Sequence, residues 1–322
     1  MQKKQLIKLL KTILPLALGV FLIWYSLQSA TPAERRELWT NIKEANPLYI
    51  ALSLLFGVLS HASRAYRWKY LLQPLGYRPR FANSFMAVMA AYLANLGIPR
   101  SGELLRAATI STYEEVPFEK AFGTIIVERL ADFCMLLLVI AIALGLQSEN
   151  LLNYMREQQI NPLITLGVLI GFLLMLWIAV RIIRNSKNRV LVKVRGFVIG
   201  LVEGMRSILQ MKNKGAFIFH TFFIWGMYVL MFWIVKFTVP ETANASWGAV
   251  LSAFVVGSFA ISATNGGIGV YPVAIGALLL VFDIPKQAGE AYGWIIWGSQ
   301  TALVIVLGAL SFLLLPLYNR RS

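Results

Sequence analysis

Long apolar runs with almost no charge recur along the entire chain. They occupy residues 13–27, 48–59, 163–180, 216–235 and 291–317, and several approach the roughly 20 residues that span the hydrocarbon core of a bilayer. The runs lack the alternating pattern of membrane strands, and unpaired backbone is costly in lipid, so we expect helices. Apolar residues make up 58% of the chain, more than a soluble fold can cover. The sequence therefore predicts an all-α polytopic membrane protein with about seven to nine membrane helices in a single transmembrane domain over residues 1–322.

The distribution of charge favours membrane orientation over nucleic-acid binding. The formal net charge is +15, from 30 basic and 15 acidic residues, and the basic residues gather between the apolar runs. Such loops stay in the cytoplasm and attract anionic headgroups, so we expect no nucleic-acid partner. We expect a bacterial inner-membrane protein with both the N- and the C-terminus in the cytoplasm. For the start of the chain, a cleaved secretory signal over residues 13–27 is the alternative.

Cysteine and histidine are too scarce for a metal centre. Cys134 is the single cysteine, so no intramolecular disulfide is possible. His61 and His220 are the two histidines and lie far apart in the sequence. We therefore expect no metal and no cofactor.

Loop charge also decides which apolar segments cross the bilayer. Residues 61–80 and 181–215 are strongly basic, so both are expected in the cytoplasm. If the apolar segment that begins at residue 81 crossed completely, the second of these loops would be forced outside. We therefore predict a re-entrant element over residues 81–110, broken at residues 97–102, and an amphipathic cytoplasmic linker over residues 181–215.

A second interruption divides the apolar segment over residues 247–282. It falls at residues 264–269, and the segment is either a hairpin or two short spans. Two broken elements that face each other from opposite leaflets are typical of inverted-repeat transporters. The alternative is that the glycines and the proline at both breaks only serve helix packing.

Ionisable residues occur within the apolar segment at residues 118–146. Glu128, Arg129 and Asp132 lie about 10–16 Å from its start at 1.5 Å per residue, close to the bilayer midplane. Each such charge is costly, which makes it a candidate functional residue. Glu128 and Asp132 share one helix face and are like-charged neighbours unless a cation or a proton intervenes. Arg129, Arg106 and Arg100 are the candidate cations.

Two interpretations of these charges are open. Glu128, Asp132 and Arg106 could form a structural ion-pair cluster that holds the re-entrant element. Alternatively, Arg100, Arg106 and the amides of residues 97–102 could bind a phosphate, because arginine binds phosphate bidentately and helix N-termini favour anions. A lipid headgroup is the expected anion.

Basic and aromatic residues alternate over residues 64–70. Arg64, Arg67 and Lys69 alternate with Tyr66, Trp68 and Tyr70. This composition is typical of an interfacial anchor with snorkelling cations. Recruitment of anionic lipid is the alternative.

Four short motifs in this order resemble one known family over nearly the whole chain. They are RAYRW at residues 64–68, PRSGELLR at 99–106, VERLAD at 127–132 and NGGIGV at 265–270. Together they resemble the membrane region of the lysylphosphatidylglycerol synthases and their stand-alone, flippase-like relatives. The resemblance implies movement of a lipid between leaflets. The candidate lipid-binding residues are Arg64, Arg67, Arg100, Glu103, Arg106, Glu128, Arg129, Asp132, Asn265, Gly266 and Gly267.

The C-terminus ends at Ser322 without the soluble aminoacyl-transferase domain of the synthases, so we expect no synthase activity. The first functional hypothesis is a flippase or transporter for an anionic lipid or a lipid-linked precursor. The second is a non-catalytic accessory subunit of a membrane enzyme of lipid or glycan synthesis, with that enzyme or a second copy of the chain as partner. An intramembrane enzyme that uses Glu128 and Asp132 as acid and base is the weakest hypothesis, because no nucleophile, HExxH motif or phosphate loop is recognised.

Overall fold

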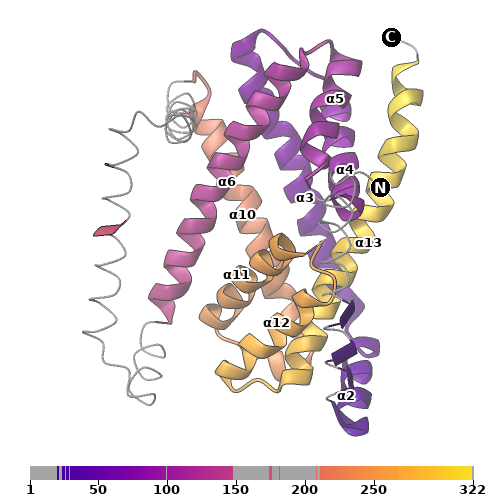
Figure 1. The fold of residues 1–322 in the computed structure, drawn as a ribbon, viewed down its shortest axis with the longest axis vertical. Helices are drawn as coiled ribbons and strands as arrows, with labels where there is room; N and C mark the ends of the chain where they lie inside the picture. Colours follow the sequence, from indigo (N-terminus) through magenta and orange to yellow (C-terminus); the bar gives the residue numbers. More distant parts are fainter. Residues whose placement is uncertain are drawn as a thin grey trace, which may run out of the picture.

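The computed structural model describes residues 30–98, 100–147, 211–264 and 266–320, with isolated positions before residue 30 and between residues 174 and 208. In these residues the chain is helical and contains no strand (Figure 1). The main helices are α2 (Pro32–Lys43), α3 (Pro47–Leu72), α4 (Phe81–Gly97), α5 (Gly102–Glu114), α6 (Phe118–Leu146), α10 (Lys214–Val235), α11 (Trp247–Ala263), α12 (Val270–Leu279) and α13 (Lys286–Asn319). The predicted all-α class is confirmed.

Three stretches in the described residues are long and apolar enough to cross a bilayer. They are Pro47–Leu75, Lys214–Thr238 and Lys286–Asn319. The chain is a multi-pass membrane protein, as predicted. The apolar runs at residues 13–27 and 163–180, the possible secretory signal and most of the predicted linker at residues 181–215 lie outside the described residues.

The helices form two successive units with the same order of elements. Each unit has a long helix, a pair of short helices and a second long helix, which are α3 to α6 in the first unit and α10 to α13 in the second. Corresponding helices begin 166 to 168 residues apart, at Pro47 and Lys214, Phe81 and Trp247, Gly102 and Val270, and Phe118 and Lys286. A nearly constant offset over four helices indicates a duplicated unit.

A matching turn precedes the last helix of each unit. Its sequence is Glu115-Val116-Pro117 in the first unit and Asp283-Ile284-Pro285 in the second. The acidic residue has a positive φ in both turns, 55° and 58°, and the β-branched residue after it is buried. The proline immediately precedes the first helical residue and cannot continue the turn's hydrogen bonding. The same turn conformation at equivalent positions supports the duplication.

The two units run in opposite directions. Figure 1 shows α3 and α10 packed side by side with opposite chain directions, and the α4–α5 pair at the other end of the molecule from the α11–α12 pair. Inverted repeats of this kind are typical of secondary transporters. The possible inverted repeat that the sequence suggested is therefore present in the arrangement of the helices.

The two short helices of each pair are separated at the break that the sequence predicted. α5 has 13 residues and α12 has 10, or about 20 Å and 15 Å at 1.5 Å per residue, whereas the hydrocarbon core is roughly 30 Å thick. Neither helix is long enough to cross alone. These lengths favour hairpins over pairs of short spans. The position of the hairpins within the bilayer stays a prediction.

The two breaks approach each other. A methyl group added at Gly266, in the second break, would lie 2.9 Å from Cδ2 of Leu96 near the end of α4. Gly266 and Gly267 have φ values of 65° and 82°, which glycine adopts without steric cost. Trp297 of α13 fixes this segment, because its Nε1 donates to the Gly266 carbonyl at 2.7 Å. The ends of the two hairpins therefore form one contact.

The α4–α5 hairpin closes at a glycine. A Cβ at Gly102 would lie 2.2 Å from the Ala91 carbonyl oxygen, so the two helix backbones touch at this point. The Gly102 N–H donates to Asn95 Oδ1 at 2.7 Å, which satisfies a free amide at the start of α5. Only glycine permits this packing.

Replacing Gly102 with alanine is therefore expected to destabilise the fold by about 1–3 kcal/mol, the usual cost of forcing a methyl group into packed backbone. Gly97 is the matched control, because a Cβ there meets no atom within 4 Å. Gly97→Ala should change stability by less than about 0.5 kcal/mol. Thermal unfolding of the purified protein in detergent measures both variants. Equal shifts for the two glycines would contradict the close approach of α4 and α5.

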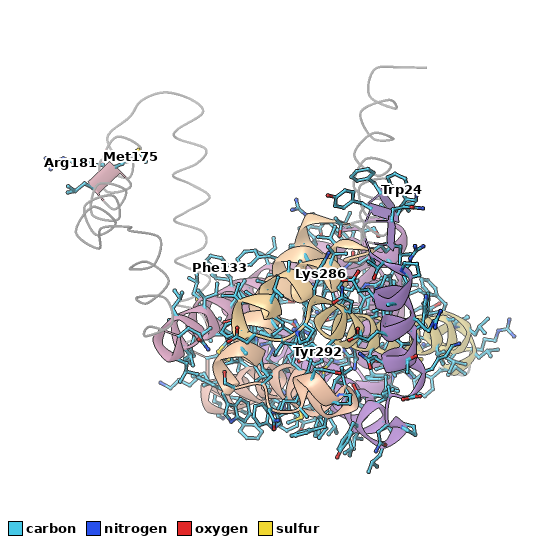
Figure 2. The ribbon with its side chains drawn as sticks, turned by 90° about the horizontal axis from the view of Figure 1, so that it is seen from below. Trp24, Phe133, Met175, Arg181, Lys286 and Tyr292 are labelled. Carbon is cyan, nitrogen blue, oxygen red and sulfur yellow. The ribbon has the colours of Figure 1, made fainter. Side chains whose placement is uncertain are left out.

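Apolar packing holds the two ends of the molecule. The larger cluster includes Phe232, Tyr271 and Tyr292, and the Tyr292 hydroxyl donates to the Phe232 carbonyl at 2.8 Å. Figure 2 shows Tyr292 among the helices. The smaller cluster joins α3, α5 and α6 around Trp68 and Ile125. It borders the charged residues described next.

Candidate functional site

Five charged side chains from three helices meet inside the first unit. They are Arg64 and Arg67 of α3, Arg106 of α5, and Glu128 and Asp132 of α6, and each is at most 8% exposed. Charged residues are almost never buried to this degree unless they are paired. We call these five residues the buried charge cluster.

Glu128 is the centre of the buried charge cluster. Its Oε1 accepts from Arg64 Nη1 and Arg67 Nη2, both at 3.0 Å, and its Oε2 lies 3.0 Å from Arg106 Nη2. Asp132 Oδ2 accepts from Arg64 Nη1 at 2.6 Å, and its Oδ1 accepts from Arg67 Nη2 at 3.0 Å. The two carboxylates thus share two guanidinium groups, which relieves the repulsion between them.

Helix periodicity explains why these residues meet. Arg64 and Arg67 are three positions apart and Glu128 and Asp132 four apart, so each pair shares one helix face. Arg64 and Arg106 lie eight residues from the ends of α3 and α5, or about 12 Å, and Glu128 lies ten residues from the start of α6, or about 15 Å. The facing helices therefore bring their charges to a similar depth.

Neutral side chains hold the arginines in position. Arg67 Nη1 donates to Thr221 Oγ1 at 2.8 Å, and Arg64 Nη2 donates to the Tyr228 hydroxyl at 3.3 Å. The Arg106 guanidinium lies over the Trp68 ring, 3.9 Å from its centroid. Trp68 is fixed in turn, because its Nε1 donates to Thr124 Oγ1 at 2.8 Å. The buried charge cluster is therefore a rigid network.

A cavity adjoins the buried charge cluster between α4, α5 and α6. It is narrow, because its open space is about 10 Å³, roughly what one water molecule requires. Its lining consists of Arg64, Val88, Ala91, Tyr92, Asn95, Gly102, Glu103, Arg106, Ile125 and Arg129. Three cations and one carboxylate line this space, so its lining favours an anion.

Several buried polar atoms of the lining lack hydrogen bonds. Among the described residues, Nε of Arg64, Nε of Arg106 and Oε2 of Glu103 have no hydrogen-bond partner. Buried polar groups are normally satisfied, and each unmade bond is costly. These three atoms belong to residues that line the cavity, which makes the residues candidates for binding a polar ligand.

The rim of the cavity carries a separate ion pair. Arg129 Nη2 donates to Glu103 Oε1 at 2.7 Å, and the two side chains are 47% and 24% exposed. Glu103 is in the first turn of α5 and Arg129 is in α6. This pair links the hairpin to the long helix at the surface of the protein.

The structure corrects the interpretation of residues 64–70 as an interfacial anchor. Arg64 and Arg67 do not snorkel, because they are 4% and 0% exposed and pair with Glu128 and Asp132. Lys69 alone fits the prediction, since its Nζ lies 3.3 Å from the Tyr66 ring centroid. Alternation of basic and aromatic residues did not reveal that the two arginines face inward.

The predicted counter-ions of Glu128 and Asp132 are also partly wrong. Arg106 pairs with Glu128 as predicted. Arg129 pairs with Glu103 instead, because residue 129 points to a different face of α6 from residues 128 and 132. Arg100 is exposed in the turn between α4 and α5, with a φ of 63°, and does not join the buried charge cluster.

The residues of the second break have a different position. Gly266 and Gly267 contact Leu96 and Trp297 rather than the cavity. Asn265 lies outside the described residues. Of the predicted binding residues, Arg64, Glu103, Arg106 and Arg129 line the cavity, while Arg67, Glu128 and Asp132 lie behind it.

Two uncharged polar side chains of the cavity, those of Tyr92 and Asn95, were not predicted. Tyr92 packs on His61, with 4.7 Å between ring centroids, and its hydroxyl lies 3.4 Å from that of Tyr228. Asn95 caps α5 through Gly102 and keeps its side-chain nitrogen as a donor. A polar residue two positions before Gly97, where the break begins, is the signal that could have identified Asn95. No group of three metal-binding side chains occurs in the part of the chain that the structure describes.

Comparison with known proteins identifies related chains. The family model for the lysylphosphatidylglycerol synthase transmembrane region matches residues 12–314. The UPF0104 membrane protein MJ1595 of Methanocaldococcus jannaschii is 33% identical over 103 residues, which cover 31% of each chain. The glycosyltransferase AglD of Haloferax volcanii is 28% identical over 125 residues, which cover 38% of this chain and 18% of AglD. No solved structure matches.

Proposed function

The chain belongs to the family of the lysylphosphatidylglycerol synthase transmembrane region, and on this basis we propose that it moves an anionic lipid between membrane leaflets. The cargo is a phospholipid or a lipid-linked precursor. The family and the AglD match support a membrane protein of lipid or glycan synthesis or flipping. The narrower assignment rests on the cavity beside the buried charge cluster.

One observation carries the proposal. Arg64 and Arg106 line the cavity at the α4–α5 break, and the Nε–H group of each has no acceptor among the described residues. Charge-assisted hydrogen bonds from arginine are strong, and their fork geometry matches phosphate. A phosphate headgroup that entered the cavity would satisfy both donors.

The inverted repeat supplies a mechanism for transfer. The two hairpins start from opposite ends of the molecule, and their breaks touch at Leu96 and Gly266. Rocking of one unit against the other around this contact would open the cavity to each leaflet in turn. The headgroup would follow the polar lining while the acyl chains stay in lipid.

We further propose a bacterial inner-membrane location with both termini in the cytoplasm. The basic N-terminus and Arg320 and Arg321 at the end of the chain support this orientation. We propose no catalytic activity for the chain itself. Its direct partner is then an anionic membrane lipid, with a second copy of the chain or a membrane enzyme as possible protein partners.

Arg129→Gln tests the proposal in a protein that should still fold. The exposed pair with Glu103 contributes about 1 kcal/mol or less to stability. Removing this cation from the cavity rim should lower the rate of leaflet transfer about tenfold, the equivalent of one modest charge-assisted contact. Transfer of fluorescent anionic phospholipids in proteoliposomes measures the rate. Arg78→Gln is the control, because Arg78 is exposed and outside the cavity. No transfer by the unmodified protein above empty vesicles would refute the proposal.

The second candidate is an accessory subunit of a membrane enzyme of lipid or glycan synthesis. The match to part of the glycosyltransferase AglD favours it. This function requires a stable protein partner rather than transfer. A co-purifying enzyme whose activity is unchanged by Arg129→Gln and by Asp132→Asn would support the accessory role over the transporter.

A further inference from the structure

A polar network joins the two units at one end of the molecule. Its members are Arg80 and Asn83 at the start of α4, Glu114 at the end of α5 and Asn319 at the end of α13. The first three belong to the first unit, and Asn319 belongs to the second. Figure 1 shows α13 running past α4 to the end of the molecule where the C-terminus lies. We call these four residues the inter-unit network.

A pair of amides forms the centre of the inter-unit network. Asn83 and Asn319 each donate from the side-chain nitrogen to the side-chain oxygen of the other, both at 2.9 Å. Asn83 is fully buried, and its Nδ2 also donates to Glu114 Oε1. Arg80 Nε donates to the same Glu114 oxygen at 2.9 Å, and its Nη2 donates to Asn319 Oδ1. The Arg80 guanidinium lies 5.2 Å from the Tyr318 ring centroid. The end of α13 is therefore bonded to both α4 residues, which Glu114 fixes to α5.

The duplication does not repeat these residues in the second unit. Corresponding helices are offset by 166 residues for α4 and by 168 residues for α5. The residues at the positions equivalent to the three network members of the first unit are Ser246, Ala249 and Phe282. Their side chains can reproduce neither the ion pair nor the amide pair. The inter-unit network therefore distinguishes one end of the inverted repeat from the other.

α13 is packed closely on α4 before the network and contains a proline next to it. A Cβ at Gly308 would lie 3.0 Å from the Met89 carbonyl oxygen, so the backbones of the two helices nearly touch there. Pro316 lies inside α13 between Gly308 and Asn319 and has no N–H for the hydrogen bond to the preceding turn. Helices bend preferentially at proline. The last residues of α13 can therefore move while the body of the helix stays packed.

We propose that the inter-unit network is a latch that holds this end of the molecule closed. It opens when the end of α13 swings away from α4 at Pro316. With the proposed orientation of the C-terminus, this end faces the cytoplasm. The inference rests on the proposed function only in giving the opening a role in leaflet transfer.

The bonds of the latch suit reversible opening. The Arg80 side chain is 39% exposed, so water can replace its partners, and hydrogen bonds that exchange with water contribute little net free energy. The buried charge cluster differs, because separating its ions would leave charges in a nearly dry environment. All its members belong to the first unit. The two units can thus part at the latch without breaking an ion pair of the cluster.

Distances between spin labels test the latch without any measure of transport. The labels are attached at Lys120→Cys in α6 and Arg320→Cys after α13, two exposed positions, with the exposed Cys134 replaced by serine. Double electron–electron resonance on the full-length protein in liposomes measures the distance distribution. Asn319→Ala should add a longer distance and raise the ratio of open to closed molecules about tenfold, the effect of one or two lost hydrogen bonds.

Three further variants control this measurement. Leu317→Ala should leave the distances unchanged, because Leu317 is 52% exposed in the same last turn of α13 and outside the network. Arg80→Gln should produce a smaller increase of the same longer distance, because the amide pair remains. Pro316→Ala combined with Asn319→Ala tests the hinge. Alanine restores the backbone hydrogen bond, so the longer distance should become less populated than in Asn319→Ala alone.

A cross-link across the latch tests its role in transfer. Arg80→Cys and Asn319→Cys are joined by a short bis-thiosulfonate reagent, again with Cys134 replaced by serine. Proteoliposomes that contain the linked protein are assayed for transfer of fluorescent anionic phospholipids before and after the link is cleaved by dithiothreitol. We expect transfer to be about tenfold slower or more in the linked protein, because the alternation between leaflets requires this end to open.

Three results would overturn the latch. They are an unchanged distance distribution in Asn319→Ala, the same change in Leu317→Ala as in Asn319→Ala, and transfer by the linked protein at the rate of the cleaved protein. Absence of transfer by the cleaved and the unmodified protein would instead refute the proposed function. The distance measurements would still decide whether the inter-unit network holds this end closed.

Discussion

Glu128→Gln is expected to destabilise the protein by about 3–5 kcal/mol, the usual effect of breaking a buried ion pair from one side. Glu128 contacts three guanidinium groups at 3.0 Å and is 1% exposed. The variant leaves Asp132 as the remaining carboxylate of the buried charge cluster, where it contacts Arg64 and Arg67, and it leaves Arg106 without its carboxylate partner. The amide has nearly the same shape as the carboxylate, so the loss of stability measures the effect of the charge rather than of packing.

Equilibrium unfolding in mixed micelles, followed by tryptophan fluorescence, measures this change. Glu119→Gln removes the same charge from an exposed position of the same helix, and should cost at most about 1 kcal/mol through the helix dipole. A change in the free energy of unfolding below about 1 kcal/mol for Glu128→Gln would show that the three guanidinium groups do not need the charge of Glu128. The ion pairs around Glu128 would then not be a structural element of the fold.

The elements that sequence could predict are those that depend on local composition. The long helices follow from apolar length, and both breaks follow from glycine and proline within apolar segments. Glu128 and Asp132 stood out because charge within an apolar run needs a partner. These predictions require no knowledge of which helices touch.

The partners of Glu128 and Asp132 depend on contacts between distant helices. Arg64 and Arg67 precede them by more than 60 residues, and their aromatic neighbours gave the appearance of a membrane interface. One sequence pattern could have revealed that Arg64 and Arg67 face the protein interior. Ser53, Gly57, Ser60, Arg64 and Arg67 recur at alternating steps of four and three along α3, and all five are buried. Small and polar residues at this spacing indicate a helix face that packs inside a membrane protein.

The duplication shows that the charged site belongs to the first unit alone. At the offsets that relate corresponding helices, Arg64 and Glu128 correspond to Met231 and Ile296, which are apolar. Asp132 corresponds to Gln300, which donates to Ser53 of α3 at 3.2 Å. The second unit therefore keeps the hairpin and its break but not the charges. In the proposed mechanism, the first unit would bind the headgroup and the second unit would supply the opposing surface.

Arg106→Lys is expected to lower leaflet transfer by about tenfold to a hundredfold while the protein still folds. Lysine keeps the positive charge near Glu128, so the buried charge cluster remains paired. It loses the Nε donor that has no partner in the described residues and the contact of the guanidinium group with the Trp68 ring. One charge-assisted hydrogen bond of about 1.5–3 kcal/mol corresponds to this change in rate.

Proteoliposome transfer rates measure the effect of Arg106→Lys, and thermal unfolding of the same preparation shows whether the fold is intact. Lys120→Arg is the control, because Lys120 is exposed near the start of α6 and tests the opposite exchange outside the cavity. If Arg106 only balances charge, Arg106→Lys will transfer lipid at the normal rate, and the phosphate-binding role fails. If Arg106 binds the headgroup, the preference for anionic over zwitterionic phospholipids should fall together with the rate. A fall in the rate without a change in lipid preference would instead identify Arg106 as part of the moving hairpin, because α5 carries both this arginine and the break at Gly102.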